Sequence, residues 1–172
     1  MSILLVPILL ALASPLFSED WPTWGRTSER NLVSPETNLA GAFYAHFSTN
    51  TGWFDLSASV NIKWAAPIGY LPFGNPVVAG GRIYLGCTRY GGTPKYTGDR
   101  GALLCLDEAT GRFLWQASIP RGPSGAYLSE ASLGICSSPT VAGNHVYYCG
   151  YNAELLALDT KQDAAFIARQ EE

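Results

Sequence analysis

The chain has 172 residues, of which 47% are hydrophobic and 15% are charged, with a formal net charge of −3. This apolar composition excludes an intrinsically disordered chain, which combines low hydrophobicity with high net charge. The negative charge and the lack of a basic cluster exclude a nucleic-acid-binding protein, because that binding depends on neutralising phosphates.

The first element in chain order is an apolar stretch at residues 3–13, which is too short to span a bilayer. Small and polar residues follow it, up to Glu19 and Asp20. This layout is typical of a secretory signal peptide, with cleavage sites after the Ala-Leu-Ala of residues 11–13 or near Ser18. We therefore predict a signal peptide at residues 1–18, export to the periplasm or the extracellular space, and no transmembrane segment after cleavage.

Residues 19–60 carry no repeat, and we interpret them as an N-terminal strap that lies over a face of the fold. A second interpretation of this segment is a ligand-binding surface, which would be lined by Trp21, Trp24, Arg26 and Arg30. The strap is the favoured interpretation.

One passage of the chain occurs twice. Residues 75–84, NPVVAGGRIY, return as residues 138–147, SPTVAGNHVY, at a spacing of 138 − 75 = 63 positions. Each copy has the pattern of a β-branched strand, a two-residue turn (Gly80-Gly81 or Gly143-Asn144) and a return strand. A second echo joins residues 103–107 to 155–159. Such repeats predict units that bury their apolar faces against one another.

The turn signals predict four antiparallel strands in the first unit and three in the second. The expected strands are residues 75–79, 82–87, 102–107, 112–117, 137–142, 145–150 and 154–159. Residues 88–100 are expected to form an exposed loop, and residues 61–66 a lone outer strand. Four antiparallel strands with short turns make one blade of a β-propeller. We therefore predict an all-β fold over residues 61–172, a partial β-propeller of about two four-stranded blades with an orphan outer strand.

Residues 106–115, LDEATGRFLW, resemble the repeat signature Ala-Leu-Asp-x-x-Thr-Gly-Lys-x-x-Trp of pyrroloquinoline-quinone-type (quinoprotein alcohol dehydrogenase-like) β-propellers. Residues 20–25, 74–81 and 133–139 look like the start of large secreted propellers of a planctomycete-type branch. After Asp159 the chain departs from the signature. Because propellers close with typically about 4–8 blades, the resemblance implies that this chain is an N-terminal fragment.

The residues that recur are interpreted as structural anchors. Trp64 and Trp115 are expected to pack between blades, since a repeated aromatic is typical of a packing position. Asp107 and Asp159 are expected to cap turns, with Gly111 in the turn after Asp107. No catalytic, cofactor-binding or metal-binding residue is identified.

The two histidines are not expected to form a site. His46 and His145 lie in different segments, and His145 occupies the turn-exit position that Arg82 holds in the other copy. We therefore expect a solvent-facing side chain at His145.

Four cysteines in an exported chain raise the possibility of disulfides, and they are Cys87, Cys105, Cys136 and Cys149. The expected register places Leu85 opposite Cys105 and Tyr148 opposite Ala157. Cys87 and Cys105 are then diagonal neighbours, with Cα atoms about 7–8 Å apart, which is beyond easy bridging distance. Cys136 and Cys149 are also diagonal neighbours, given a turn at Gly143-Asn144. Because no Cys-x-x-Cys is present, zinc and haem sites lack their spacing. Small buried hydrophobic positions are the favoured interpretation.

Two functions remain open. The first is a non-catalytic exported module that binds a protein or other macromolecule through its loops, as implied by resemblance to the propeller component of outer-membrane assembly machinery. The second is the N-terminal part of an alcohol or sugar dehydrogenase that uses pyrroloquinoline quinone and calcium. The sequence lacks the adjacent cysteines and the haem motif of such enzymes. We expect the binding module and no cofactor, with either a protein or other macromolecule bound through the propeller loops or a complementary set of blades as the partner.

Overall fold

The computed structural model describes residues 18–37, 39–69, 72–87, 100–120, 134–150 and 154–161. The predicted signal peptide, most of the predicted 88–100 loop and the last residues of the chain lie outside this part. Within it, the only helical element is one 3-10 turn, η1 (Leu56–Ala58). No helix in these ranges is long and apolar enough to cross a membrane.

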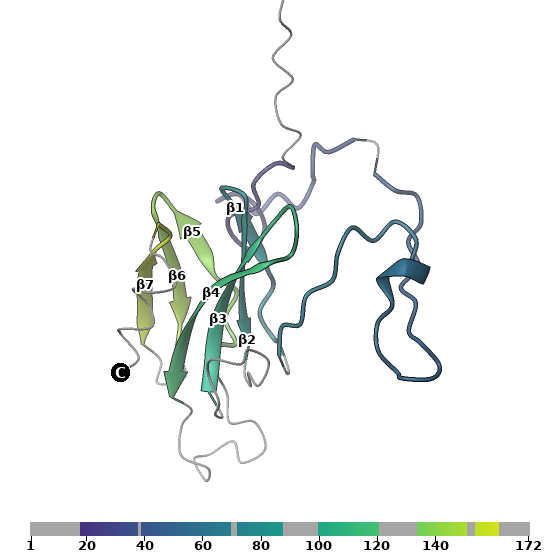
Figure 1. Cartoon of the computed structure of the whole chain (residues 1–172). Helices are drawn as coiled ribbons and strands as arrows, with labels where there is room; N and C mark the ends of the chain where they lie inside the picture. Colours follow the sequence, from purple (N-terminus) through teal and green to yellow (C-terminus); the bar gives the residue numbers. More distant parts are fainter. Residues whose placement is uncertain are drawn as a thin grey trace, which may run out of the picture.

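Seven strands form two antiparallel sheets (Figure 1). The first has the order β1 (Val77–Ala79), β2 (Arg82–Cys87), β3 (Arg100–Asp107) and β4 (Phe113–Pro120). The second has the order β5 (Thr140–Ala142), β6 (His145–Cys149) and β7 (Leu155–Asp159). The prediction of an all-β, blade-like fold is confirmed, with strand bounds that differ from the expected ones by a few residues.

The two repeated turns have the predicted form. Ala79 pairs with Arg82, so that Gly80 and Gly81 alone connect β1 to β2. Both glycines have positive φ, +59° and +73°, which type I′ turns require and which residues with a Cβ adopt at a cost. Gly143 repeats the first of these values, with a φ of +59°.

The predicted pairing register is wrong by one residue. Tyr84, not Leu85, lies opposite Cys105, and Leu156, not Ala157, lies opposite Tyr148. In the second sheet Gly150 N–H donates to the Glu154 carbonyl at 3.0 Å, which leaves three residues between them where the prediction assumed a two-residue turn. Since a shift of one position moves a strand's side chains to the opposite face, the correct register turns the side chains of β3 over relative to β2. Cys87 and Cys105, predicted as diagonal neighbours, therefore lie on opposite faces of the first sheet.

The two sheets share one hydrophobic core. Ile135, just before β5, is fully buried, and its N–H donates to the Cys87 carbonyl at 3.1 Å. A Cβ on Gly101 would lie 2.4 Å from the Cα of Gly134, so only glycine allows this close approach. The core combines Ile135 with side chains of both sheets, namely Val77, Ala79, Tyr84, Leu103, Cys105, Trp115, Ala117, Ile119, Val146 and Tyr148. The two sheets are therefore packed against each other over one core, which is consistent with a partial β-propeller.

The predicted orphan strand at residues 61–66 is a strand of neither sheet. Burial nevertheless alternates without interruption along residues 61–69, with the even-numbered residues half-buried and the odd-numbered ones exposed. Ile68 packs against a second cluster of the first blade, formed by Cys87, Ala102 and Leu104. The segment thus has the two-residue side-chain period of a strand and packs on the first blade without a strand neighbour in the described chain.

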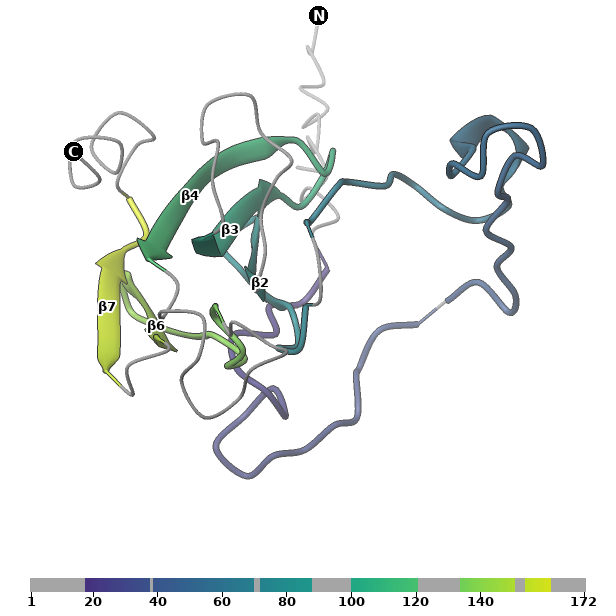
Figure 2. The same cartoon turned by 90° about the horizontal axis from the view of Figure 1, so that it is seen from below.

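The strap has two differently placed parts. Trp21 forms an antiparallel bridge with Val78 of β1, which brings the start of the strap onto the sheet edge. The arm, which we define as residues 39–60, lies away from both sheets (Figures 1 and 2). Two isolated bridges hold it together, Tyr44 with Val60 and Phe47 with Phe54.

Candidate functional site

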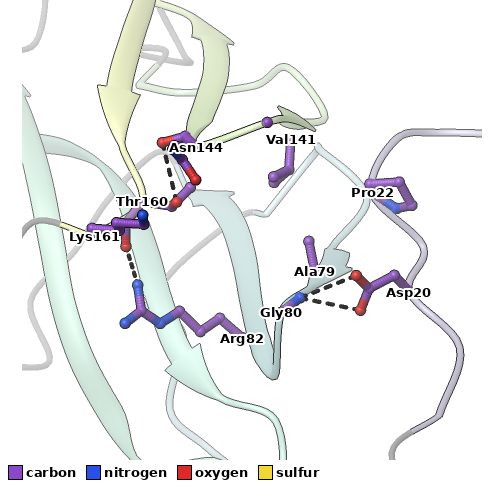
Figure 3. A pocket seen from close by; sticks show the side chains of 10 residues that line it. Asp20, Pro22, Ala79, Gly80, Arg82, Val141, Asn144, Thr160 and Lys161 are labelled. Carbon is purple, nitrogen blue, oxygen red and sulfur yellow. Dashed lines mark hydrogen bonds between the residues drawn. The ribbon is translucent and has the colours of Figure 1, made fainter.

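A cavity of about 550 Å³ lies at the turn end of the two blades, beside the start of the strap (Figure 3). Its lining comes from both blades and from the strap, and comprises Asp20, Pro22, Ala79, Gly80, Arg82, Val141, Gly143, Asn144, Thr160 and Lys161. Volumes of this size are typical of small-ligand pockets. The cavity depends on the joining of the two blades, because neither blade supplies more than part of it.

The strap is fixed to the cavity wall by backbone and carboxylate hydrogen bonds. The Trp21 N–H donates to the Val78 carbonyl at 2.7 Å, and the Trp21 carbonyl accepts the Val78 N–H at 3.0 Å. Val141 N–H of β5 donates to the Pro22 carbonyl at 2.7 Å, so the strap bridges the first strands of both blades. Asp20 accepts the Gly80 N–H with both carboxylate oxygens, at 3.1 and 3.2 Å.

The opposite wall is held by the end of β7. Thr160 donates its N–H to the Asn144 carbonyl at 2.7 Å and its hydroxyl to the same oxygen at 3.1 Å. The Arg82 guanidinium donates to the Thr160 carbonyl, a contact that joins the first blade to the second. Arg82 is therefore held at the cavity by a hydrogen bond across the blade junction (Figure 3).

Sequence reasoning missed this site. The repeat alignment brings Gly80 and Gly143 to equivalent positions, but it does not show that Asp20 returns to the first turn from 60 positions away. The sequence feature that could have indicated the site is a difference between the two copies at the residue directly after the turn. That residue is Arg82 in the first copy and His145 in the second.

The structure places the predicted anchors Trp64 and Gly111 in direct contact. A Cβ on Gly111 would lie 2.4 Å from the Trp64 ring, and the Trp64 indole N–H donates to the Glu108 carbonyl at 3.0 Å. Asp107 accepts the Thr110 N–H at 2.9 Å and the Thr110 hydroxyl at 2.6 Å. These hydrogen bonds from Thr110 are the main reason that the pKa of Asp107 lies below its ordinary value.

The remaining anchors are Trp115 on β4 and Asp159 at the end of β7. Trp115 is 3% exposed and packs beside the Tyr84 ring at a centroid distance of 5.9 Å. Its indole nitrogen is buried without a hydrogen-bond partner in the described chain. Asp159 accepts the Lys161 N–H at 2.8 Å, which makes it a turn residue. All five anchors thus take part in packing or in turns.

The aromatic and basic residues of the strap make separate contacts. Trp24 carries the Arg30 guanidinium over its ring, 5.4 Å from the centroid. Arg26 forms an ion pair with Glu19 and donates to the Val33 carbonyl at 3.2 Å. Only Trp21, through its backbone, is joined to a blade by these interactions.

The two histidines have aromatic neighbours of their own. The His46 ring lies 6.2 Å from Tyr44 in the arm, and the exposed His145 ring lies 6.1 Å from Tyr147 on β6. The expected solvent-facing position of His145 is confirmed. In the ranges that the structure describes, no three His, Cys, Asp or Glu side chains gather where they could hold a metal ion.

The four cysteines are all free thiols. Cys87 and Cys105 are fully buried, as expected, whereas Cys136 is half-buried and Cys149 is exposed, so the buried interpretation is wrong for Cys149. Burial raises the pKa of Cys87 to about 11 and that of Cys105 to about 12. Because the thiolate is the reactive form, the two buried thiols are chemically inert near neutral pH.

Comparison with known proteins assigns the family. No curated protein matches the chain. A family model described as "Outer membrane protein assembly factor BamB", built on a pyrroloquinoline-quinone-type repeat, matches residues 36–171. The match covers most of the chain, including the arm and both sheets, and agrees with the repeat and with the blade geometry. The chain therefore belongs to the BamB-like family of pyrroloquinoline-quinone-type β-propeller repeat proteins.

Proposed function

We propose that the chain is an exported, non-catalytic β-propeller module that works by binding a protein partner or complementary blades. The observation that carries this proposal is the extended segment 61–69. Its side chains alternate in burial as those of a strand do, yet it belongs to neither sheet. A row of backbone N–H and C=O groups without a strand neighbour is a template for an added strand.

The second sheet supports the same function through the edge of its last strand, β7. Within the described residues β7 pairs with β6 alone, so its outer edge is open. Leu155 on this strand lies opposite Cys149 and is 71% exposed, and none of the residues of β7 is fully buried. An apolar strand with an open edge is typical of a surface that another strand covers.

Export is supported by two features. The apolar stretch at residues 3–13 has the length and position of a signal peptide. The description of the matching family refers to assembly at the outer membrane. The proposed location is therefore the periplasm or the exterior of the cell, and the proposed partner is a protein.

A single proline substitution in the extended segment tests the binding function. Lys63 is exposed, so Lys63→Pro removes one backbone N–H from the pairing row while leaving the buried face of the segment unchanged. We expect Lys63→Pro to abolish association with a partner or a second copy in sedimentation velocity, and the matched Lys63→Ala to retain it. Equal association of the two variants would contradict the proposal.

A separate assay tests the non-catalytic part of the proposal. Purified protein is mixed with pyrroloquinoline quinone and calcium, and bound chromophore and dye-linked alcohol oxidation are measured. We expect neither. A bound chromophore with alcohol oxidation would show a quinoprotein oxidoreductase instead.

A further inference from the structure

The cavity at the blade junction contains an acidic side chain of the protein itself, and this contact shows what the turn can bind. Asp20 arrives from the strap and accepts the Gly80 N–H with both carboxylate oxygens, at 3.1 and 3.2 Å. The turn amide of the first blade is therefore occupied by a carboxylate carried on an extended peptide.

The second blade has a two-residue turn at the equivalent position, Gly143-Asn144, and no carboxylate of the described chain binds there. Gly143 is the repeat equivalent of Gly80, lines the same cavity and has the same φ of +59°. Its N–H has no hydrogen-bond partner in the described chain. A Cβ built on Gly143 would have no neighbour within 4 Å, so there is open space beside this amide.

The charges that line the cavity favour an anion at this second turn. Arg82 and Lys161 are the cationic lining residues, and Asp20 is the acidic one. The hydrogen bond from Arg82 to the Thr160 carbonyl spans the blade junction and fixes the guanidinium on the cavity wall. Because the Asp20 carboxylate already accepts the Gly80 N–H, the cavity offers an arriving carboxylate two cationic lining residues and the Gly143 amide.

We propose that this cavity binds a carboxylate carried on an extended peptide of a partner, with the carboxylate at the Gly143 amide and with Arg82 and Lys161 as the cations of the same cavity. The bound peptide repeats at the second blade what the strap does at the first. Pro22, Ala79 and Val141 supply an apolar wall for the flanking residues of the peptide. The identity of the occupant as a partner peptide rests on the proposed binding function.

The test uses the purified full chain and two fluorescent tripeptides, acetyl-Gly-Asp-Gly-amide and acetyl-Gly-Asn-Gly-amide, each labelled at the same end. The two probes have nearly the same shape and differ in charge. Fluorescence anisotropy should show the Asp peptide binding at least about tenfold more tightly than the Asn peptide, because a hydrogen bond to a charged acceptor is stronger than one to a neutral acceptor.

Two variants assign the binding to the cavity. Lys161→Gln changes an exposed residue and keeps the fold, and Arg82→Gln removes the second cation, with its fold checked by circular dichroism. Each should weaken the Asp peptide several-fold and leave the Asn peptide unchanged. His145→Gln, which lies next to the turn but does not line the cavity, is the matched control and should have no effect.

Equal binding of the two peptides, or Asp-peptide affinity unchanged in both Lys161→Gln and Arg82→Gln, would overturn the proposal. A competition arm distinguishes the source of the carboxylate: acetate should displace the Asp peptide only at far higher concentration, and displacement at equal concentration would overturn the peptide as occupant. If the carboxylate preference fails while the Lys63→Pro effect holds, the cavity proposal is wrong and the binding function stands.

Discussion

The ring of Trp64 lies against the backbone of Gly111, at a distance that leaves no room for any side chain there. The contact joins the extended segment to the turn between β3 and β4, and the Trp64 indole secures it by donating to the Glu108 carbonyl at 3.0 Å. Residues separated by 47 positions are thus fitted to each other in shape and in hydrogen bonding. This accounts for the segment staying on the first blade although it has no strand neighbour among the residues that the structure describes.

Gly111→Ala should destabilise the protein more than a glycine substitution at a comparable turn. Its Cβ would meet the Trp64 ring at 2.4 Å, in addition to the strain of a φ of +70°. The matched control is Gly81→Ala, where φ is +73° and no atom lies within 4 Å of the added Cβ. We expect Gly111→Ala to cost about 1–3 kcal/mol more than the control, from overpacking, in urea unfolding. Equal losses would show that Trp64 moves aside freely.

Trp115→Ala should damage folding, and His145→Ala should not. Trp115 is 3% exposed in the core that both blades share, and truncation of a buried large aromatic costs about 3–5 kcal/mol. His145 is exposed, and surface changes usually stay within about 0.5 kcal/mol. Thermal unfolding of both variants measures this difference. Similar losses in the two proteins would refute the role given to Trp115.

Thiol reactivity should separate the cysteines by burial. At pH 8, we expect iodoacetamide to modify the exposed Cys149 and to leave Cys87 and Cys105 unmodified. Burial raises the pKa of Cys87 to about 11 and that of Cys105 to about 12, so both stay protonated and unreactive. Mass spectrometry of the alkylated and digested protein identifies the modified sites. Rapid labelling of Cys105 in folded protein would contradict the shared core.

Asp107 should contribute to stability above pH 4 and lose that contribution in acid. The hydrogen bonds from Thr110 hold its pKa below the ordinary value of 3.8, so the folded state binds this proton less readily than the unfolded state does. The stabilisation is therefore present above the ordinary pKa and falls as the pH drops through the lowered one. Asp107→Asn should show a flatter dependence of stability on pH between about 2 and 5, as measured by urea titration. An unchanged pH slope would contradict this role.

The sequence predicts the blade architecture because the repeat combines β-branched strands with glycine turns at fixed positions. The turn at Gly80 and Gly81 is confirmed for that reason, since its φ values are accessible mainly to glycine. The register was mispredicted by one residue because the connection from Gly150 to Glu154 has an odd number of residues, which turn composition alone does not reveal.

The cavity could not be predicted from the sequence either, and the physical reason differs from the one that explains the register error. Its polar contacts join Asp20 to Gly80 and Arg82 to Thr160, so each depends on how two distant segments are packed. A repeat alignment compares equivalent positions and carries no information about such pairs. The extended segment was found through the resemblance of Trp64 to Trp115, but the absence of a strand neighbour in the described chain appears only in the structure.

The central claim is that this protein presents unpaired β surfaces that associate with a partner. The open outer edge of β7 and the extended segment 61–69 both lack strand neighbours in the part of the chain that the structure describes. Such edges template association. Sedimentation velocity of the purified chain over a range of concentrations tests this most directly: we predict self-association that grows with concentration, and a monodisperse monomer with one cooperative thermal transition would contradict it.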